Sequence, residues 1–303
     1  MASPLLERHG AVAGSGVDAD VAAHYGDPLR EQRVLFEGGA VVDRSHRGVV
    51  RVAGPDRLSW LHSLVSQHVE SLPVGEEREA LILSPHGHVE HHLVLRDDGD
   101  ATWIACEPQT SADLVGYLDS MRFMLRVEVE DLSASHGVVS EVAGDAVRDE
   151  IVPIPELVAR IDASGLPLVG HGAWEAHRVA RHVPRLGFET DHRTIPHEVG
   201  WIGVAVHLDK GCYRGQETVA RVHNLGRPPR RLVFGHLDGT LDELPPRHTP
   251  VELDGRAVGF LGTAVHHAEV GPVALAVVKR ATPDDAPLTT AGMAIKIEPV
   301  VVA

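Results

Sequence analysis

A short glycine- and proline-rich stretch at 226–229 divides this chain into two regions with different secondary-structure patterns. Its sequence, Gly-Arg-Pro-Pro, ends regular structure, because proline lacks a backbone N–H and glycine favours turns. After it, extended runs alternate with turn residues, and Asp254-Gly255 is a strong hairpin signal between two of them. The region after 226 is therefore predicted to be a small β-barrel or sandwich. Its extended runs lie at 231–237, 251–253, 256–259, 274–278 and 295–302.

The region from 49 to 129 instead alternates extended and helical patterns in the order β-α-β-β-β-α-β. Pro55 and Asp56 are typical of a helix start, and the leucines that follow recur at helical spacing. A second helix is predicted to begin after Thr110 and to reach Met121. This order resembles a split β-α-β unit of the ferredoxin-like type with an added strand. The strands are predicted at 49–52, 80–83, 89–95, 102–106 and 123–129.

Length and composition limit the class of protein. The chain has 303 residues, which is enough for two or three domains. Its formal charge of −15 argues against binding nucleic acid by general charge neutralisation, so no direct nucleic-acid partner is expected. No apolar run approaches the ~20 residues of a membrane span, and the N-terminus lacks the order of a signal peptide, so no membrane partner is expected. Two widely separated cysteines provide no disulfide framework, and the predicted location is a reducing cytoplasm.

The octapeptide at 210–217, Lys-Gly-Cys-Tyr-Arg-Gly-Gln-Glu, carries the strongest functional signal. A cation near a thiol favours the thiolate, and Lys210 stands two residues before Cys212. Residues 216–222 read as helix-forming, so Cys212 precedes a helix N-terminus, which also favours an anion. Glycines at 211 and 215 allow a sharp turn or a close backbone approach. The pattern predicts a reactive or metal-binding thiol, and the alternative is a small, inert, buried cysteine.

This octapeptide resembles the signature of the YgfZ family, whose members are folate-binding-type relatives of the glycine-cleavage T-protein, an aminomethyltransferase. The octapeptide is specific, and weaker similarity extends over residues 30–300. The further short matches are Pro196-His197-Glu198 with Gly200, Val258-Gly259, and Gly262-Thr263.

The resemblance implies an α+β chain with the T-protein type of fold, which combines a ferredoxin-like central part with a C-terminal β-barrel. In T-protein relatives the first domain is discontinuous in sequence, with the second domain inserted into it. For this chain the implied ranges are 1–30 for an N-terminal tail, 31–48 with 135–225 for the folate-binding-type domain that carries the cysteine motif, 49–134 for the ferredoxin-like domain, and 226–303 for the barrel.

The resemblance further implies a role in iron–sulfur cluster assembly or repair, and support of cluster-dependent enzymes, including those of tRNA methylthiolation. In that role Cys212 is the reactive or ligand-bearing group, and Lys210 favours its thiolate. The implied cofactor is tetrahydrofolate or another folate, with transient contact to an iron–sulfur cluster. The implied partners are iron–sulfur client or assembly proteins. The predicted ligand-binding residues are Gly211, Tyr213, Gly215, Gln216, Glu217, Arg178 and Glu198.

Two departures from the T-protein pattern change the expected chemistry. True aminomethyltransferases carry an acidic pair where this chain has His91 and His92, so the transferase activity is predicted to be absent. Ala180 stands where relatives hold the pterin with a carboxylate. Since the amidine edge of a pterin suits a carboxylate acceptor, folate affinity should be weak unless Glu175 or Glu198 replaces that acid.

Three other functions remain open. One is a folate-dependent one-carbon transferase. Another is a metal-binding protein that uses His88, Glu90 and His92, which share one face if 88–95 is a strand. The last is a scaffold without chemistry, in which Cys212 only packs.

Overall fold

A five-stranded sheet with two helices forms the part of the chain that the sequence predicts to be ferredoxin-like. A computed structural model describes residues 1–239 and 243–299. The sheet order is β5-β6-β7-β4-β8, which is a split β-α-β arrangement with β5 added at one edge. In chain order the elements are β4 (Gly48–Ala53), α2 (Arg57–Leu64), β5 (Glu77–Leu83), β6 (Val89–Asp97), β7 (Ala101–Cys106), α3 (Ser111–Met121) and β8 (Glu128–Asp131).

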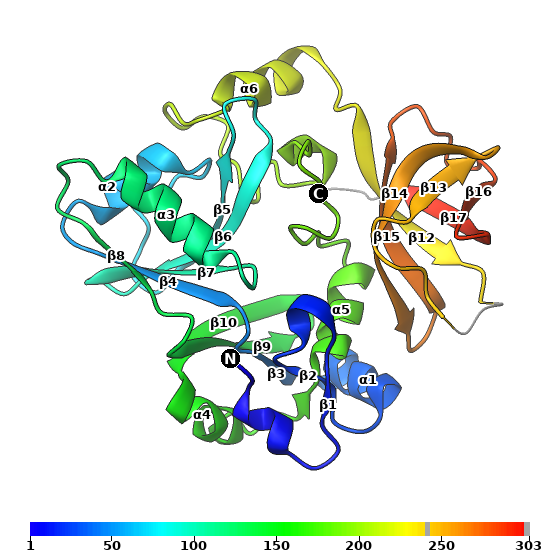
Figure 1. The fold of residues 1–303 in the computed structure, drawn as a ribbon, viewed down its shortest axis with the longest axis horizontal. Coiled ribbons are helices and arrows are strands. Elements are labelled where there is room, and N and C mark those ends of the chain that lie inside the picture. The colour runs from blue at the N-terminus through cyan, green and yellow to red at the C-terminus, as the bar shows by residue number, and fades with distance from the viewer. Residues whose placement is uncertain (240–242, 300–303) are drawn as a thin grey trace. The chain divides into compact units, whose positions relative to one another are not determined.

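Helices α2 and α3 pack on the same face of this sheet (Figure 1). Alternate strand residues such as Val50 and Val52 point to that face, as the period of two in a strand requires. Leu61 of α2 and Leu114 of α3 are fully buried against them. Burial of this apolar surface, rather than helix propensity, holds two such short helices in place.

The predicted strand at 123–129 is wrong for residues 123–127, because β8 begins only at Glu128. Phe123 is 93 % exposed and has a positive φ of 47°. The loop is held by Asp56, whose carboxylate accepts bonds from the backbone N–H of Arg126 at 2.9 Å and from its guanidinium at 2.7 Å. The local hydrophobic pattern around 123–129 does not indicate this contact with the N-cap of α2.

A second sheet, of four strands, has the order β10-β9-β3-β11. Its strands are β3 (Ala40–Arg44), β9 (His136–Ala143), β10 (Ala146–Pro153) and β11 (Leu168–Val169). The N-terminal residues pack rather than extend as a loose tail, since Leu5 and Val21 are fully buried. The surrounding elements are η1 (Pro4–Glu7), β1 (Val12–Ala13), η2 (Gly16–Asp18), β2 (Ala22–His24), α1 (Pro28–Gly38), η3 (Ile154–Glu156) and α4 (Leu157–Ala163).

The C-terminal region is a closed six-stranded barrel, as the sequence predicts. Its order is β12-β15-β14-β13-β16-β17, and Leu261 lies in its apolar core. Asp254 and Gly255 both have positive φ, of 50° and 72°, as a two-residue hairpin turn of type I′ requires. The strands are β12 (Arg230–Leu237), β13 (Pro250–Leu253), β14 (Arg256–His267), β15 (Gly271–Lys279), β16 (Leu288–Thr290) and β17 (Met293–Pro299). Residues 300–302 of the last predicted strand lie outside the described residues.

Packing divides the described chain into two units that do not follow the predicted domain ranges, which stay predictions. Unit 1 comprises 1–82, 91–174 and 205–213. Unit 2 comprises 83–90, 175–204 and 214–303, of which 240–242 and 300–303 are not described. The remaining helices are α5 (His171–Ala180), η4 (Pro196–Glu198) and α6 (Gln216–Leu225). No helix within the described residues combines the length and apolar character needed to cross a bilayer.

Candidate functional site

The thiol of Cys212 is exposed, whereas the other cysteine of the chain, Cys106, is buried. Both are free cysteines. Burial raises the pKa of Cys106 to about 11, so that thiol is neutral and shielded near pH 7. The helix predicted to follow the cysteine motif is confirmed, since α6 begins at Gln216, four residues after Cys212. The alternative of a buried Cys212 is therefore wrong, since this residue is exposed.

Lys210 anchors the cysteine segment to the end of α2. Its ammonium donates to the backbone carbonyls of His62 and Val65, the latter at 2.5 Å. Val65 is the C-cap of α2, where the unpaired carbonyls and the helix dipole favour a cation. Lys210 is only 6 % exposed, and burial lowers its pKa to about 8. The sequence predicts that Lys210 favours the Cys212 thiolate, and in the structure its ammonium binds the carbonyls at the end of α2.

The ring of Tyr213 packs against the ammonium of Lys210. Its ring centroid lies 5.1 Å from the Lys210 Nζ, which is within the range of a cation–π contact. Tyr213 is 8 % exposed, and burial raises its pKa to about 12. Gly211 contributes no such packing, because a Cβ added there would meet open space. Residues 210 and 213 therefore hold the segment, and the exposed thiol lies between them in sequence.

In unit 2 the motif continues at the tip of the β5–β6 hairpin (Figure 1). Gly215 has a φ of 84°, and a Cβ there would lie 2.6 Å from the carbonyl oxygen of Ser84. The Arg214 guanidinium lies 3.2 Å from the Glu90 carboxylate on the same hairpin tip. Glycine at 215 is thus required both by its left-handed conformation and by the close backbone approach. Gln216 and Glu217 occupy the first turn of α6, where Glu217 is exposed.

Arg178 is buried in an ion-pair network and is not open to a ligand. It is 3 % exposed and contacts the carboxylates of Glu175 at 2.7 Å and Glu189 at 3.0 Å. It also donates to the hydroxyl of Thr263 on β14, whose backbone N–H donates to Glu189 at 2.7 Å. Burial lowers the pKa of Arg178, but the two carboxylates outweigh it and raise the pKa overall. The network joins 175–189 to the barrel within unit 2.

Glu198 is also committed to an arginine. Its carboxylate lies 2.7 Å from Arg230 Nη2 and accepts a bond from the backbone N–H of Ile195 at 3.2 Å. The same arginine pairs with Asp191 at 2.6 Å. Glu175 is paired as well, with Arg178. Both acids that could replace the carboxylate missing at Ala180, Glu175 and Glu198, therefore already bind an arginine instead of a pterin. The ion-pair partners of Arg178 and Glu198 lie at positions that the local sequence pattern does not indicate.

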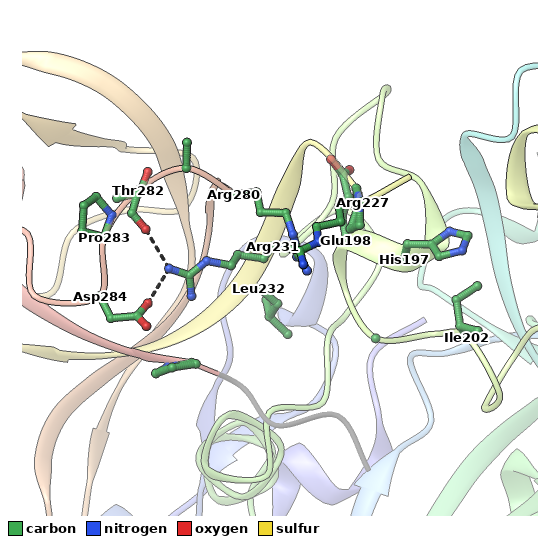
Figure 2. Close-up of a pocket in the computed structure, with 14 residues that line it drawn as sticks. His197, Glu198, Ile202, Arg227, Arg231, Leu232, Arg280, Thr282, Pro283 and Asp284 are labelled. Atoms are coloured by element: carbon green, nitrogen blue, oxygen red, sulfur yellow. Dashed lines mark hydrogen bonds and ion pairs between the residues drawn. The ribbon is translucent and has the colours of Figure 1, made fainter. Parts of the chain in front are cut away.

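A pocket of about 760 Å³ lies within unit 2 (Figure 2). Arg231 on its wall donates to the carbonyl of Thr282 at 2.9 Å and to the carboxylate of Asp284 at 2.5 Å. Arg227 and Arg280 also line it, and neither guanidinium has an ion pair within the described residues. Such guanidinium groups suit an anionic ligand. The other lining residues are His197, Glu198, Gly200, Ile202, Pro228, Leu232, Ala281, Pro283 and Pro299.

Arg280 is the pocket residue that sequence reasoning missed. The cluster at Arg227, Arg230 and Arg231 is visible in the sequence, but Arg280 lies far from it along the chain. The antiparallel pairing of β12 with β15 places Arg230 opposite Lys279, which brings Arg280 next to the cluster. Only the barrel register, which has no local signal, could have revealed this.

His88, Glu90 and His92, the alternative metal ligands that the sequence leaves open, do not share one set of contacts. Glu90 pairs with Arg214, and His92 lies 2.8 Å from the carboxylate of Glu79. Within the described residues, one group of possible metal ligands lies within 4.8 Å of one another, and it contains none of these three residues. The metal alternative on this face stays a prediction that the geometry does not favour.

Comparison with protein-family models gives no match. Among curated proteins, the chain is similar to a chloroplastic protein of Arabidopsis thaliana named only as a candidate transferase, with 24 % identity over 82 % of this chain and 67 % of that one. An aminomethyltransferase of Symbiobacterium thermophilum is 23 % identical over 86 % of this chain and 84 % of its own length. A mitochondrial homologue of the iron–sulfur cluster assembly factor IBA57 from Mycosarcoma maydis is 25 % identical over 62 % of this chain and 55 % of its own.

The solved structures include a clear match of fold. The glycine cleavage system aminomethyltransferase T from Bartonella henselae superposes with a TM-score of 0.81 at 16 % identity, over 98 % of this chain and 95 % of that one. The predicted fold class is therefore confirmed: the chain has the aminomethyltransferase fold, with its closed C-terminal barrel.

The two glycines of the motif should respond differently to alanine. Gly215→Ala is expected to lower the free energy of unfolding by about 1–3 kcal/mol, because the new Cβ meets a carbonyl at a positive φ. Gly211→Ala is the matched control and should be nearly neutral, since its Cβ meets open space. Urea denaturation of both variants measures this. Equal stability of the two would contradict the proposed contact with the hairpin tip.

The buried Lys210 should make stability rise with pH on the alkaline side. Its folded pKa is about 8, whereas an unfolded lysine has a pKa of about 10.4. Between these values the unfolded chain still holds the proton that the folded chain has released, so raising the pH favours folding, by about 3 kcal/mol across the window. Because burial of Cys106 and Tyr213 acts in the opposite direction over the same range, the test compares proteins: from pH 7.5 to 10.5 the stability of the wild type and of an exposed-site control, Lys296→Met, should rise relative to that of Lys210→Met. Parallel profiles for all three proteins would disprove the low pKa.

Proposed function

We propose that this chain is a YgfZ-type protein that supports the assembly or repair of iron–sulfur clusters, with Cys212 as its working group. The observation that carries the proposal is an exposed thiol in a segment whose neighbours, Lys210 and Tyr213, are buried. The similarity to a homologue of a cluster assembly factor supports the same class of function. The octapeptide at 210–217 supports the narrower assignment to the YgfZ type.

The proposed substrate of such a protein is the cluster or a sulfur-bearing fragment of it, and Cys212 is the residue that contacts it. A thiolate is both the nucleophile of thiol chemistry and the preferred ligand of iron in clusters. An exposed thiol can reach a group held by another protein, which a buried cysteine such as Cys106 cannot. The partners expected on this basis are client or assembly proteins in a reducing compartment, where thiols stay free.

A folate is the small molecule that we propose for the pocket of unit 2. Folates carry carboxylates on their glutamate tail, and Arg227 and Arg280 offer guanidinium groups without ion pairs within the described residues. Because Ala180 supplies no carboxylate and Glu175 is paired with Arg178, the pterin end should be held weakly. We therefore expect affinity for a folate to depend on charge at its tail and to fall with salt.

The second candidate is a folate-dependent aminomethyltransferase, since several similar proteins carry that name. That chemistry needs a fixed negative charge beside a developing cation, and this chain has His91 and His92 where the acidic pair is expected. Burial lowers the pKa of His91, so its ring is held neutral near pH 7. Robust formation of methylenetetrahydrofolate from an aminomethyl donor would favour this candidate over ours.

Replacement of Cys212 tests the proposed function directly. In a strain that lacks its own YgfZ-type protein, Cys212→Ser should fail to restore cluster-dependent enzymes, whereas the buried-site control Cys106→Ala should restore them. The level of methylthiolated tRNA, measured by mass spectrometry, reports on one such enzyme. Circular dichroism and protein level in the cell show whether each variant is folded. Full restoration by a folded Cys212→Ser variant would overturn the proposal.

Replacement of the pocket arginines tests the folate proposal separately. Arg227→Gln combined with Arg280→Gln should weaken binding of tetrahydrofolate with an oligoglutamate tail by about tenfold, since each exposed charge pair is worth up to about 1 kcal/mol. Calorimetric titration at two salt concentrations measures the affinity. An Arg122→Gln variant, which changes an exposed arginine outside the pocket, should bind like the wild type. Equal affinity of the double variant and the wild type would remove the pocket from the account.

A further inference from the structure

Three possible metal ligands from distant parts of the sequence meet inside unit 1. Asp18 ends η2, His46 lies in the turn between β3 and β4, and His171 is the first residue of α5. Their ligand atoms all lie within 4.8 Å of one another. The Nε2 of His46 is 2.9 Å from the Asp18 carboxylate, and the His46 and His171 rings meet edge to face at 4.9 Å. None of these residues belongs to the cysteine segment or to the pocket of unit 2.

The group is buried, which distinguishes it from acidic and histidine clusters on a surface. The side chain of His46 is 1 % exposed and that of Asp18 is 15 % exposed, while His171 is 5 % exposed as a residue. Placing a carboxylate among buried groups costs free energy unless a cation or several donors compensate it. A divalent ion held between the carboxylate and two neutral imidazoles provides that compensation.

The backbone around the group is fixed by contacts that do not use the three ligands. A Cβ at Gly170 would lie 2.3 Å from the carbonyl oxygen of Ala23, so α5 starts directly against the N-terminal segment. The Gly170 N–H also donates to the Glu31 carboxylate at 2.8 Å. A site held in this way is preorganised, because its ligands need not order when an ion arrives.

The turn that carries His46 is anchored in the same manner. The Asp43 carboxylate accepts bonds from the Ser3 hydroxyl at 2.5 Å and from the backbone N–H of Ser45 at 2.9 Å. Asp43 is 2 % exposed. Two segments that supply ligands, the N-terminal residues and the β3–β4 turn, are thereby tied to each other next to the ligand group.

We propose that Asp18, His46 and His171 form a binding site for a divalent first-row transition-metal ion such as zinc. Two imidazoles with one carboxylate are a ligand set typical of zinc and of non-haem iron(II). Three protein ligands leave a further coordination position for water or another small ligand. The alternative is a hydrogen-bonded group that only ties the N-terminal residues to α5.

Metal binding by the purified full chain decides between these possibilities. Chelator-treated protein is titrated with Zn²⁺ in competition with a chromophoric chelator, and with Co²⁺ as a spectroscopic probe. The wild type should bind one ion per chain, and its Co²⁺ form should show the visible bands of nitrogen and oxygen ligands. His46→Gln with His171→Gln should abolish binding, and Asp18→Asn should weaken it by at least about tenfold.

A matched control uses another pair of histidines, His88 and His92. His88→Gln with His92→Gln should bind Zn²⁺ like the wild type, since those residues have separate surroundings. Loss of binding in this control, or unchanged stoichiometry in the His46 and His171 variant, would overturn the proposal. So would a wild type that binds no Zn²⁺ above the level of the control buffer.

Two measurements keep the test valid if the double variant fails to fold. Asp18→Asn has nearly the same volume and can still hydrogen-bond to His46, so it should fold while binding Zn²⁺ more weakly. In the wild type, Zn²⁺ should shift the nitrogen resonances of the His46 and His171 rings in NMR spectra. Unchanged resonances at both rings, with normal folding, would show that the three residues are a hydrogen-bonded group alone.

Discussion

The ammonium of Lys210 and the carbonyls at the end of α2 form the contact on which the proposed site depends. A buried lysine loses hydration, and the carbonyls of His62 and Val65 replace it with hydrogen bonds. The same contact supplies the C-terminal cap that α2 needs. Because 210 and 213 are held, the residue between them that carries the thiol is displayed at a defined place although it is exposed. Lys210 therefore acts on the cysteine segment by fixing its position.

In unit 2, the buried carboxylates are paired with arginines. Its buried carboxylates at Glu175, Glu189 and Glu198 are committed to arginines that join the chain segments to the barrel. These are acids of the kind that would recognise the amidine edge of a pterin. Arg227 and Arg280, which have no ion pair within the described residues, line a pocket. A site built in this way selects for negative charge in its ligand, which is why the proposed folate contact rests on the tail rather than on the ring.

Local sequence signals predicted much of the fold. The hairpin at Asp254-Gly255 and the helix after the cysteine motif were predictable, because turn residues and helix starts depend on neighbours in the sequence. The start of the strand at 123–129 was misplaced because residue 126 is held in a loop by Asp56, which is 70 residues away in the sequence. For the same reason the partners of Lys210, the place of Arg280 in the pocket and the meeting of Asp18, His46 and His171 were not visible. Each depends on which strands and loops lie side by side.

Hydrogen–deuterium exchange of the wild type and Lys210→Met tests the central claim, that this lysine holds the cysteine segment in place. The account predicts that amides of 205–213 exchange more slowly in the wild type than in the variant. The barrel amides of 230–237 should exchange equally in both proteins, because they belong to unit 2. Unchanged protection of 205–213 after loss of the lysine would contradict the account.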